Sequence, residues 1–144
     1  MKPRDSRFGL WLALGLLAAS AGCGRSALET VPVEGVLKFK AAQKPETATV
    51  YFSPVEPAAG LPRRPGFGKL EADSTFKVAS FRPGDGLVPG KYRIKVECYR
   101  AAKGGSWRKG AFELQEIEVP ADQTDPLRLD LAAPDFGYDQ ETSM

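Results

Sequence analysis

The sequence predicts an all-β protein, a single antiparallel β-sandwich of seven strands. Seven short segments alternate apolar with polar residues, which is the two-residue period of a strand with one buried face. Glycine and proline are frequent between these segments and favour turns there. Beyond residue 30 no segment has the period of a helix, so two packed sheets are the expected architecture.

The first two predicted strands span residues 31–40 and 47–54. Their residues of one parity are apolar, while charged residues such as Glu34 and Lys38 occupy the other parity of the first strand. The apolar set is Val31, Val33, Leu37, Phe39, Ala48, Val50 and Phe52. Because proline cannot donate to a sheet ladder, Pro54 is expected to end the second strand.

The middle of the chain predicts a long surface loop followed by two strands. Residues 54–68 crowd four prolines and three glycines, a composition that favours an extended loop. Strand character returns weakly over residues 68–72 and clearly over residues 74–81, with a turn at Asp73 and Ser74 between them. In the second of these strands the inward residues are Phe76 and Val78.

The clearest predicted strand spans residues 91–99, and the last spans residues 127–131. In both, apolar and charged residues alternate, so each strand has one face in the core and one in solvent. The inward set is Tyr92, Ile94, Val96, Cys98, Leu127, Leu129 and Leu131. After Pro134 the chain has no period, and residues 134–144 are expected to form a flexible tail that leaves residues 31–133 as the domain.

The remaining strand, residues 111–119, changes parity part-way along its length. Between Leu114 and Ile117 the apolar residues move from one parity to the other. A β-bulge adds one residue to a strand and so restores a single buried face. The pattern therefore predicts a bulge near Gln115.

The first 22 residues have the anatomy of a secretory signal peptide. Lys2, Arg4 and Arg7 precede an apolar run over residues 8–21 that ends in small residues. This run is shorter than the roughly 20 residues that a membrane-spanning helix needs. We therefore expect residues 1–22 to be cleaved and not to span a membrane.

The end of that run, SAGC, resembles the lipobox of bacterial lipoproteins, although Ser20 stands where the family usually has Leu. The resemblance implies that the Cys23 thiol receives a diacylglyceryl group, that further acylation such as palmitate follows, and that residues 23–30 form a lipidated tether. Each buried methylene contributes about 0.8 kcal/mol, so two or three chains hold a domain at a membrane. The alternative is an ordinary secretory signal with an incidental cysteine.

A second resemblance rests on residues 81–99, FRPGDGLVPGKYRIKVECY. This run is similar to a segment of the small planctomycete-type lipoproteins whose domain is a carboxypeptidase-regulatory-like, or transthyretin-like, sandwich. VEGVLKF, VYFSP, ADSTFKV and PGKYRIKV occur in the family's order, so the resemblance covers most of residues 31–100; Ser74 stands where the family's turn usually has glycine. It implies a seven-stranded sandwich tethered to a membrane or cell envelope, generally without assigned catalytic residues.

Charge and composition exclude several classes of function. Loss of residues 1–22, which hold three basic and one acidic residue, leaves 17 basic and 17 acidic side chains, so nothing drives binding to nucleic acid. The chain has no histidine, the commonest general base and metal ligand. Asp73 and Asp85 lie in turns that their own carboxylates are expected to cap, without calcium spacing. We expect neither enzyme activity nor a metal or cofactor.

Two core residues carry polar atoms. Tyr92 follows a loop rich in glycine and proline, and its hydroxyl is expected to be hydrogen-bonded, as at the corners of sandwiches. Cys98 continues the apolar parity of its strand and is expected to be a buried small hydrophobe rather than a reactive thiol.

One basic region with aromatic residues is a candidate ligand surface. Its members are Lys91, Arg93, Lys95, Tyr99, Arg100, Trp107, Arg108 and Lys109. Cations beside aromatic rings suit an anionic polymer or envelope polysaccharide, whereas the plainer interpretation is a solvated sheet face.

These features together predict a lipid-anchored module on the extracytoplasmic side of a cell membrane or outer membrane. Its expected role is structural, or binding of another protein through the β-sandwich. The alternative function is a carbohydrate or anionic-polymer binding module that uses the basic, aromatic face.

Overall fold

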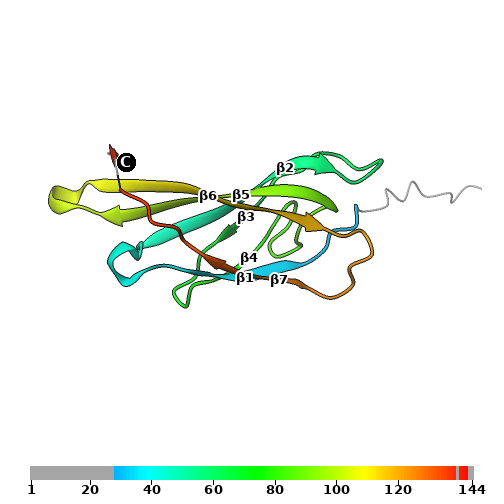
Figure 1. Cartoon of the computed structure of the whole chain (residues 1–144), viewed down its shortest axis with the longest axis horizontal. Helices are drawn as coiled ribbons and strands as arrows, with labels where there is room; N and C mark the ends of the chain where they lie inside the picture. Colours follow the sequence, from blue (N-terminus) through cyan, green and yellow to red (C-terminus); the bar gives the residue numbers. More distant parts are fainter. Residues whose placement is uncertain (1–27, 139, 143–144) are drawn as a thin grey trace, which may run out of the picture.

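Two β-sheets packed against each other make up the computed structural model, which describes residues 28–138 and 140–142 (Figure 1). The predicted all-β, two-sheet architecture is confirmed, and no α-helix occurs in the described residues. The strands are β1 (Val33–Lys38), β2 (Thr47–Pro57), β3 (Gly66–Lys69), β4 (Thr75–Lys77), β5 (Gly90–Ala101), β6 (Trp107–Val119), β7 (Leu127–Ala132) and β8 (Gln140–Thr142). Two 3₁₀ turns, η1 (Ala41–Gln43) and η2 (Lys103–Gly105), lie between strands.

The larger sheet has the strand order β3-β2-β5-β6-β8, and the smaller has the order β4-β1-β7. Seven strands correspond to the seven predicted segments, and β8 is an eighth that the sequence pattern does not show. The predicted count of seven is therefore one strand short of the described fold.

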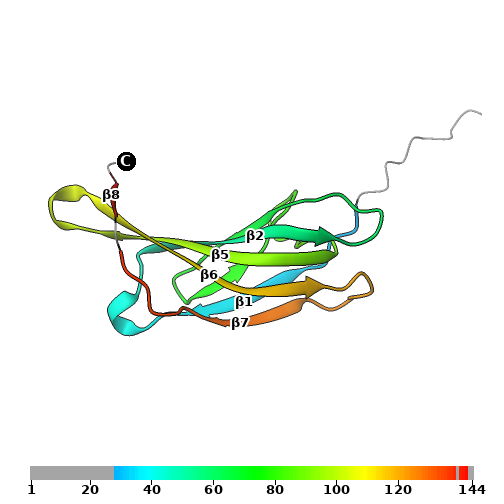
Figure 2. The same ribbon diagram turned by 45° about the horizontal axis from the view of Figure 1, so that its top comes forward.

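The prediction of a wholly antiparallel sandwich is wrong for one strand pair. β1 and β7 are parallel, with Val33 opposite Leu127 and Lys38 opposite Ala132. After β6 the chain does not fold back as a hairpin in the same sheet. Residues 120–126 carry it across to the other sheet, where β7 joins the free edge of β1 in the same direction (Figure 2).

Two irregularities bend the larger sheet. The register of β5 and β6 shifts between Arg93 and Lys95, which places both Leu114 and Gln115 opposite one residue of β5 and confirms the predicted bulge. Pro54 does not end β2 as predicted. A register shift between Pro54 and Glu56 lets the strand continue past the proline to Pro57.

The core forms where the predicted inward faces of the two sheets meet. Leu37, Val50, Phe52, Ile94 and Val96 are wholly buried, and Phe76 and Val78 of the smaller sheet pack in the same cluster. Alternation therefore predicted the buried face of each main strand correctly, because a pleated strand sends successive side chains to opposite sides.

The two sheets are joined along one side, where β3 and β4 approach each other. Phe67 and Ala79 exchange backbone hydrogen bonds of 3.0 and 2.9 Å. Further along, the Glu71 amide donates to the Thr75 carbonyl at 2.8 Å and closes a turn in which Ser74 has a φ of 69°. We call this the β3–β4 side.

The start of the described chain and the tip of the β5–β6 hairpin lie at opposite ends of the sandwich. Leu28, where the described chain begins, is at the end that carries the 120–126 connection, and η2, the tip of the β5–β6 hairpin, is at the other end (Figures 1 and 2). The expected signal peptide, residues 1–22, and Cys23 lie outside the described residues.

The segment after Pro134 differs from the expected flexible tail over the residues that the structure describes. Phe136 and Tyr138 pack against the core, and the Ala133 amide donates to the Lys38 carbonyl at 2.8 Å. Beyond them β8 pairs with residues 107–109 of β6. Ring packing, not an alternating pattern, holds this segment, so periodicity could not reveal it.

Candidate functional site

The predicted ligand surface is divided between the two faces of the larger sheet. Arg100 shares the parity of the buried residues of β5, and Arg108 lies opposite it on β6. The other six members point to the outer, solvent face of the sheet: Lys91, Arg93, Lys95, Tyr99, Trp107 and Lys109. The structure therefore brings six of the eight residues together and places two on the opposite face.

The four cations on the outer face are each within ion-pair distance of a glutamate. Lys91 lies 3.6 Å from Glu56, and Arg93 lies 2.9 Å from Glu116. Four ion pairs thus place a carboxylate beside each of these four cations, two of them through the shared partner Glu97. The face offers little free positive charge to an anionic polymer.

Glu97 is the centre of this charge network. Its carboxylate lies 3.4 Å from the Lys95 ammonium and 3.1 Å from the Lys109 ammonium. Partial burial acts to raise the pKa of Glu97, but hydrogen bonds and charges from Lys109 and Lys95 outweigh it, and the pKa is lowered. The hydrogen bond that the Lys109 ammonium donates to Glu97 in turn raises the pKa of Lys109.

Arg100 has a structural environment on the other face. Its guanidinium donates to the Ala42 carbonyl at 3.0 Å and lies 4.6 Å from the ring centre of Tyr138. It thus ties η1 and the segment after β7 to the hairpin.

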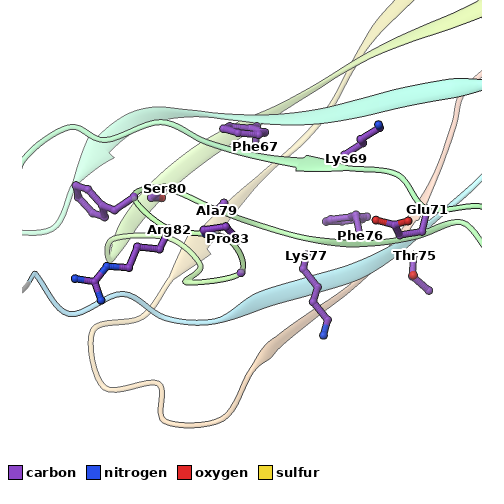
Figure 3. A pocket seen from close by; sticks show the side chains of 12 residues that line it. Phe67, Lys69, Glu71, Thr75, Phe76, Lys77, Ala79, Ser80, Arg82 and Pro83 are labelled. Carbon is purple, nitrogen blue, oxygen red and sulfur yellow. The ribbon is translucent and has the colours of Figure 1, made fainter.

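A groove on the β3–β4 side has a volume of about 710 Å³. Phe67 and Phe81 line it with exposed fractions of 54% and 46%. Figure 3 shows Lys69 and Lys77 extending from β3 and β4 in opposite directions, and Arg82 extending from the loop after β4. No ion pair of the described residues involves any of these three cations.

The loop that carries Phe81 and Arg82 is built around one carboxylate. Asp85 accepts backbone amide hydrogen bonds from Ser80 at 2.8 Å and from Phe81 and Arg82 at 3.0 Å each. The Ser80 hydroxyl donates to the Gly86 carbonyl at 2.7 Å. The loop is therefore fixed from within and holds Phe81 and Arg82 at the surface.

The prediction that aspartates cap their own turns is confirmed at both tested positions. Besides Asp85, the Asp73 carboxylate accepts bonds from the amide of Thr75 at 3.0 Å and from its hydroxyl at 2.6 Å. The hydrogen bond from the hydroxyl lowers the pKa of Asp73. Each carboxylate has a conformational role in its turn.

Both polar core residues lie where the sequence predicted them. The Tyr92 hydroxyl donates to the Val88 carbonyl at 2.7 Å, and burial raises the pKa of Tyr92 to about 12. Cys98 is a buried free thiol whose sulfur lies 3.5 Å from the Gly110 carbonyl, and burial raises its pKa. A thiol that is buried and protonated is a poor nucleophile.

Sequence reasoning missed the exposed aromatic residues of the groove. Phe67 shares the parity of Lys69, and Phe81 shares the parity of Lys77, so both rings stand on the polar side of their segments. An aromatic residue on the polar parity was the available signal. Phe67 falls in the long surface loop predicted over residues 54–68, and only Phe76 and Val78 are predicted to be inward in the next strand, so neither exposed ring is part of the predicted ligand surface.

Within residues 28–138 and 140–142, no helix has the length and apolar character to cross a membrane, and no three His, Cys, Asp or Glu side chains are placed to share a metal ion. Comparison with protein-family models, with curated proteins and with solved structures finds no match to this chain.

Proposed function

We propose that the protein is a lipid-anchored module of the extracytoplasmic side of a membrane, held there by acyl chains on Cys23. The observation that carries this proposal is the arrangement of the two ends of the sandwich. The chain that follows Cys23 joins the domain at Leu28, whereas the β5–β6 hairpin projects from the opposite end. An anchor at Cys23 therefore attaches the domain to the lipid at the end opposite the hairpin.

The tether is short enough to hold the domain close to the bilayer. Four residues lie between Cys23 and Leu28, and the five peptide bonds that join the two residues span at most about 17 Å when extended. The end of the domain around Leu28 thus stays near the headgroups, and the far end is accessible to other components of the envelope.

We propose a structural or protein-interaction role rather than catalysis. The described residues whose pKa values are raised by burial, Tyr92, Tyr138 and Cys98, all lie in packed positions. The two loop aspartates are occupied by hydrogen bonds within their own turns. These side chains stabilise the sandwich, which leaves its projecting hairpin and its surface to meet a partner.

The anchor is tested by labelling cells with a radioactive or clickable fatty acid. The wild-type chain is expected to incorporate the label and to fractionate with membranes, and Cys23→Ala is expected to do neither. Cys98→Ala is the matched control, because it removes the other cysteine and keeps the acceptor, so it should label fully. Mass spectrometry that finds an unmodified residue 23 in the mature protein would refute the proposal.

A further inference from the structure

The large hydrophobic side chains that the described residues expose run from the outer face of the larger sheet, at β2 and β3, to the β3–β4 side. They are Leu28, Tyr51, Phe67 and Phe81, with exposed fractions of 41%, 38%, 54% and 46%. Tyr51 and Phe67 are cross-strand neighbours of β2 and β3. Phe67 and Phe81 line the same groove, and Phe81 and Leu28 line the same depression beside it. The four residues thus form a continuous apolar strip.

Cations accompany this strip along its whole length. Lys69 and Lys77 flank Phe67, Arg82 follows Phe81, and the Arg64 guanidinium lies 4.5 Å from the centre of the Phe81 ring. None of the four takes part in an ion pair within the described part of the chain, in contrast to the paired cations of the outer sheet face.

Few acidic groups offset these charges. Glu71 lines the groove, and Glu29 lies beside Leu28. Glu34 is the cross-strand neighbour of Lys77, but its carboxylate lies 3.2 Å from the Arg128 guanidinium. Asp85 is close to Arg82, but its carboxylate is bound by three backbone amides. The strip therefore carries an excess of free positive charge next to exposed phenyl rings.

We propose that this side of the domain lies against an anionic lipid surface. The membrane-facing strip consists of Leu28, Tyr51, Phe67, Lys69, Lys77, Phe81 and Arg82. This inference rests on the proposed anchor, because the short tether from Cys23 joins the domain at Leu28, one end of the strip. The domain is then held by its acyl chains and by a second, reversible contact.

The chemistry of the strip fits a lipid surface better than a sugar polymer. Phenyl rings enter the boundary between headgroups and acyl chains, and lysine and arginine contact lipid phosphates while their stems lie on apolar surface. A polysaccharide needs dense polar partners, whereas most of the lining surface of the groove is apolar, and Phe67 and Phe81 are its large exposed side chains. An acidic protein partner is the competing occupant and is distinguished below.

A single tryptophan reports the contact directly. Trp107 is the only tryptophan after residue 22, and it lies near the hairpin tip, at the other end from Leu28. The chain purified from membranes is reconstituted in vesicles of equal parts phosphatidylcholine and phosphatidylglycerol, with brominated lipid as quencher. Phe81→Trp with Trp107→Phe places the same reporter on the strip, and Phe67→Trp with Trp107→Phe gives a second position.

The expected result is a blue shift and quenching at positions 81 and 67 that is at least roughly twice that of Trp107 in the wild-type chain. Reversal of the three strip cations, Lys69→Glu, Lys77→Glu and Arg82→Glu, should reduce the quenching at position 81, as should vesicles of phosphatidylcholine alone. Reversal of Lys103 and Arg108 to Glu, two exposed cations near the hairpin tip, is the matched control and should leave the quenching at position 81 unchanged.

The results of these experiments distinguish failure of the proposed strip contact from failure of the proposed anchor at Cys23. A lipid-modified Cys23 with equal quenching at positions 81 and 107 would overturn the strip contact and leave the anchor intact. An unmodified Cys23 would overturn both. A photo-crosslinker at position 67 that yields a protein adduct instead of a lipid adduct in intact cells would assign the strip to a protein partner and also overturn the lipid contact.

Discussion

The hydroxyl of Tyr92 donates a hydrogen bond of 2.7 Å to the carbonyl oxygen of Val88, four residues earlier in the chain. The carbonyl oxygen of Arg64 lies 3.2 Å from the same hydroxyl. Tyr92 is 2% exposed, so both carbonyls meet this hydroxyl in the interior. The residue joins the start of β5 to the loop before it and to the long loop between β2 and β3.

Removal of this hydroxyl should destabilise the domain with little change in its shape. Tyr92→Phe keeps the ring in the core but leaves the Val88 carbonyl without its donor, which costs about 1–2 kcal/mol. Urea titration followed by circular dichroism measures the difference. A variant as stable as the wild type would show that the hydrogen bond contributes nothing net.

The same residue predicts a loss of stability in alkali. Burial raises the pKa of Tyr92 to about 12 from 10, so the folded state holds this proton more tightly than the unfolded state does. Its contribution is complete below pH 10 and is lost as the pH rises towards 12. The stability difference between wild type and Tyr92→Phe should therefore shrink over this range, and a constant difference would contradict the assignment.

Substitution of two glycines in the loop before β5 distinguishes the cost of backbone strain from the cost of a steric overlap. Gly84 and Gly86 both have positive φ, 72° and 93°. A Cβ at position 84 would meet no atom within 4 Å, whereas a Cβ at position 86 would overlap the Val31 carbonyl group. Gly84→Ala should cost about 1 kcal/mol, and Gly86→Ala more than about 4 kcal/mol. Equal losses in thermal melts would show that packing against Val31 is not the constraint.

The parity of each main strand could be read from the sequence, because burial of one face leaves a period of two in any pleated segment. The β1–β7 pairing could not, since the direction of a strand depends on where its connection crosses between sheets. The strip was missed for a different reason. Parity marks Phe67 as outward and Phe76 as inward, but only the packing of β3 beside β4 brings Phe67 and Phe81 to one groove.

The segment after β7 shows the same limit and gives a further prediction. Phe136 lies 4.8 Å from Phe112 and 6.1 Å from Phe39 between ring centres, and it packs over Gly110. Phe136→Ala should therefore destabilise the domain by about 2 kcal/mol in urea titration. Phe67→Ala, which removes an exposed ring of the same size, is the control and should change stability by less than about 0.5 kcal/mol.

Exposure of Cys98 gives a second readout of that packing. The thiol lies beside Gly110, beneath the same ring. In the native wild type it should react slowly with a thiol reagent, and Phe136→Ala should accelerate the reaction. An unchanged rate would mean that the ring does not cover this part of the core.

The turn between β3 and β4 is a site for stabilisation. Ser74 has a φ of 69°, a left-handed conformation that costs a residue with a Cβ about 1–2 kcal/mol. Ser74→Gly removes this strain. Because glycine also gives the unfolded chain more conformational freedom, the expected net gain in stability is about 0.5–1 kcal/mol. Ser74→Ala keeps the strain and should give no gain. Thermal melts of the three proteins decide the matter.

Glu97 controls how much positive charge the outer sheet face offers to solvent. Its carboxylate lies within ion-pair distance of Lys95 and Lys109, and Glu97→Gln leaves both ammonium groups without that partner. The variant should elute from a heparin-type resin at higher salt than the wild type, because two more cations become available. Its stability should fall by at most about 1 kcal/mol, since both lysines are partly exposed and ion pairs at the surface contribute little.

Retention on the heparin-type resin also tests whether the outer sheet face is a binding site for an anionic polymer. If it is, Trp107→Ala should weaken retention of the wild-type protein, because an aromatic ring beside cations is part of the site. If the face is a solvated sheet surface, Trp107→Ala should elute with the wild type while Glu97→Gln still shifts. The ion pairs of Lys91, Arg93, Lys95 and Lys109 favour the second result. Early elution of Trp107→Ala in low salt would instead support a polymer-binding role.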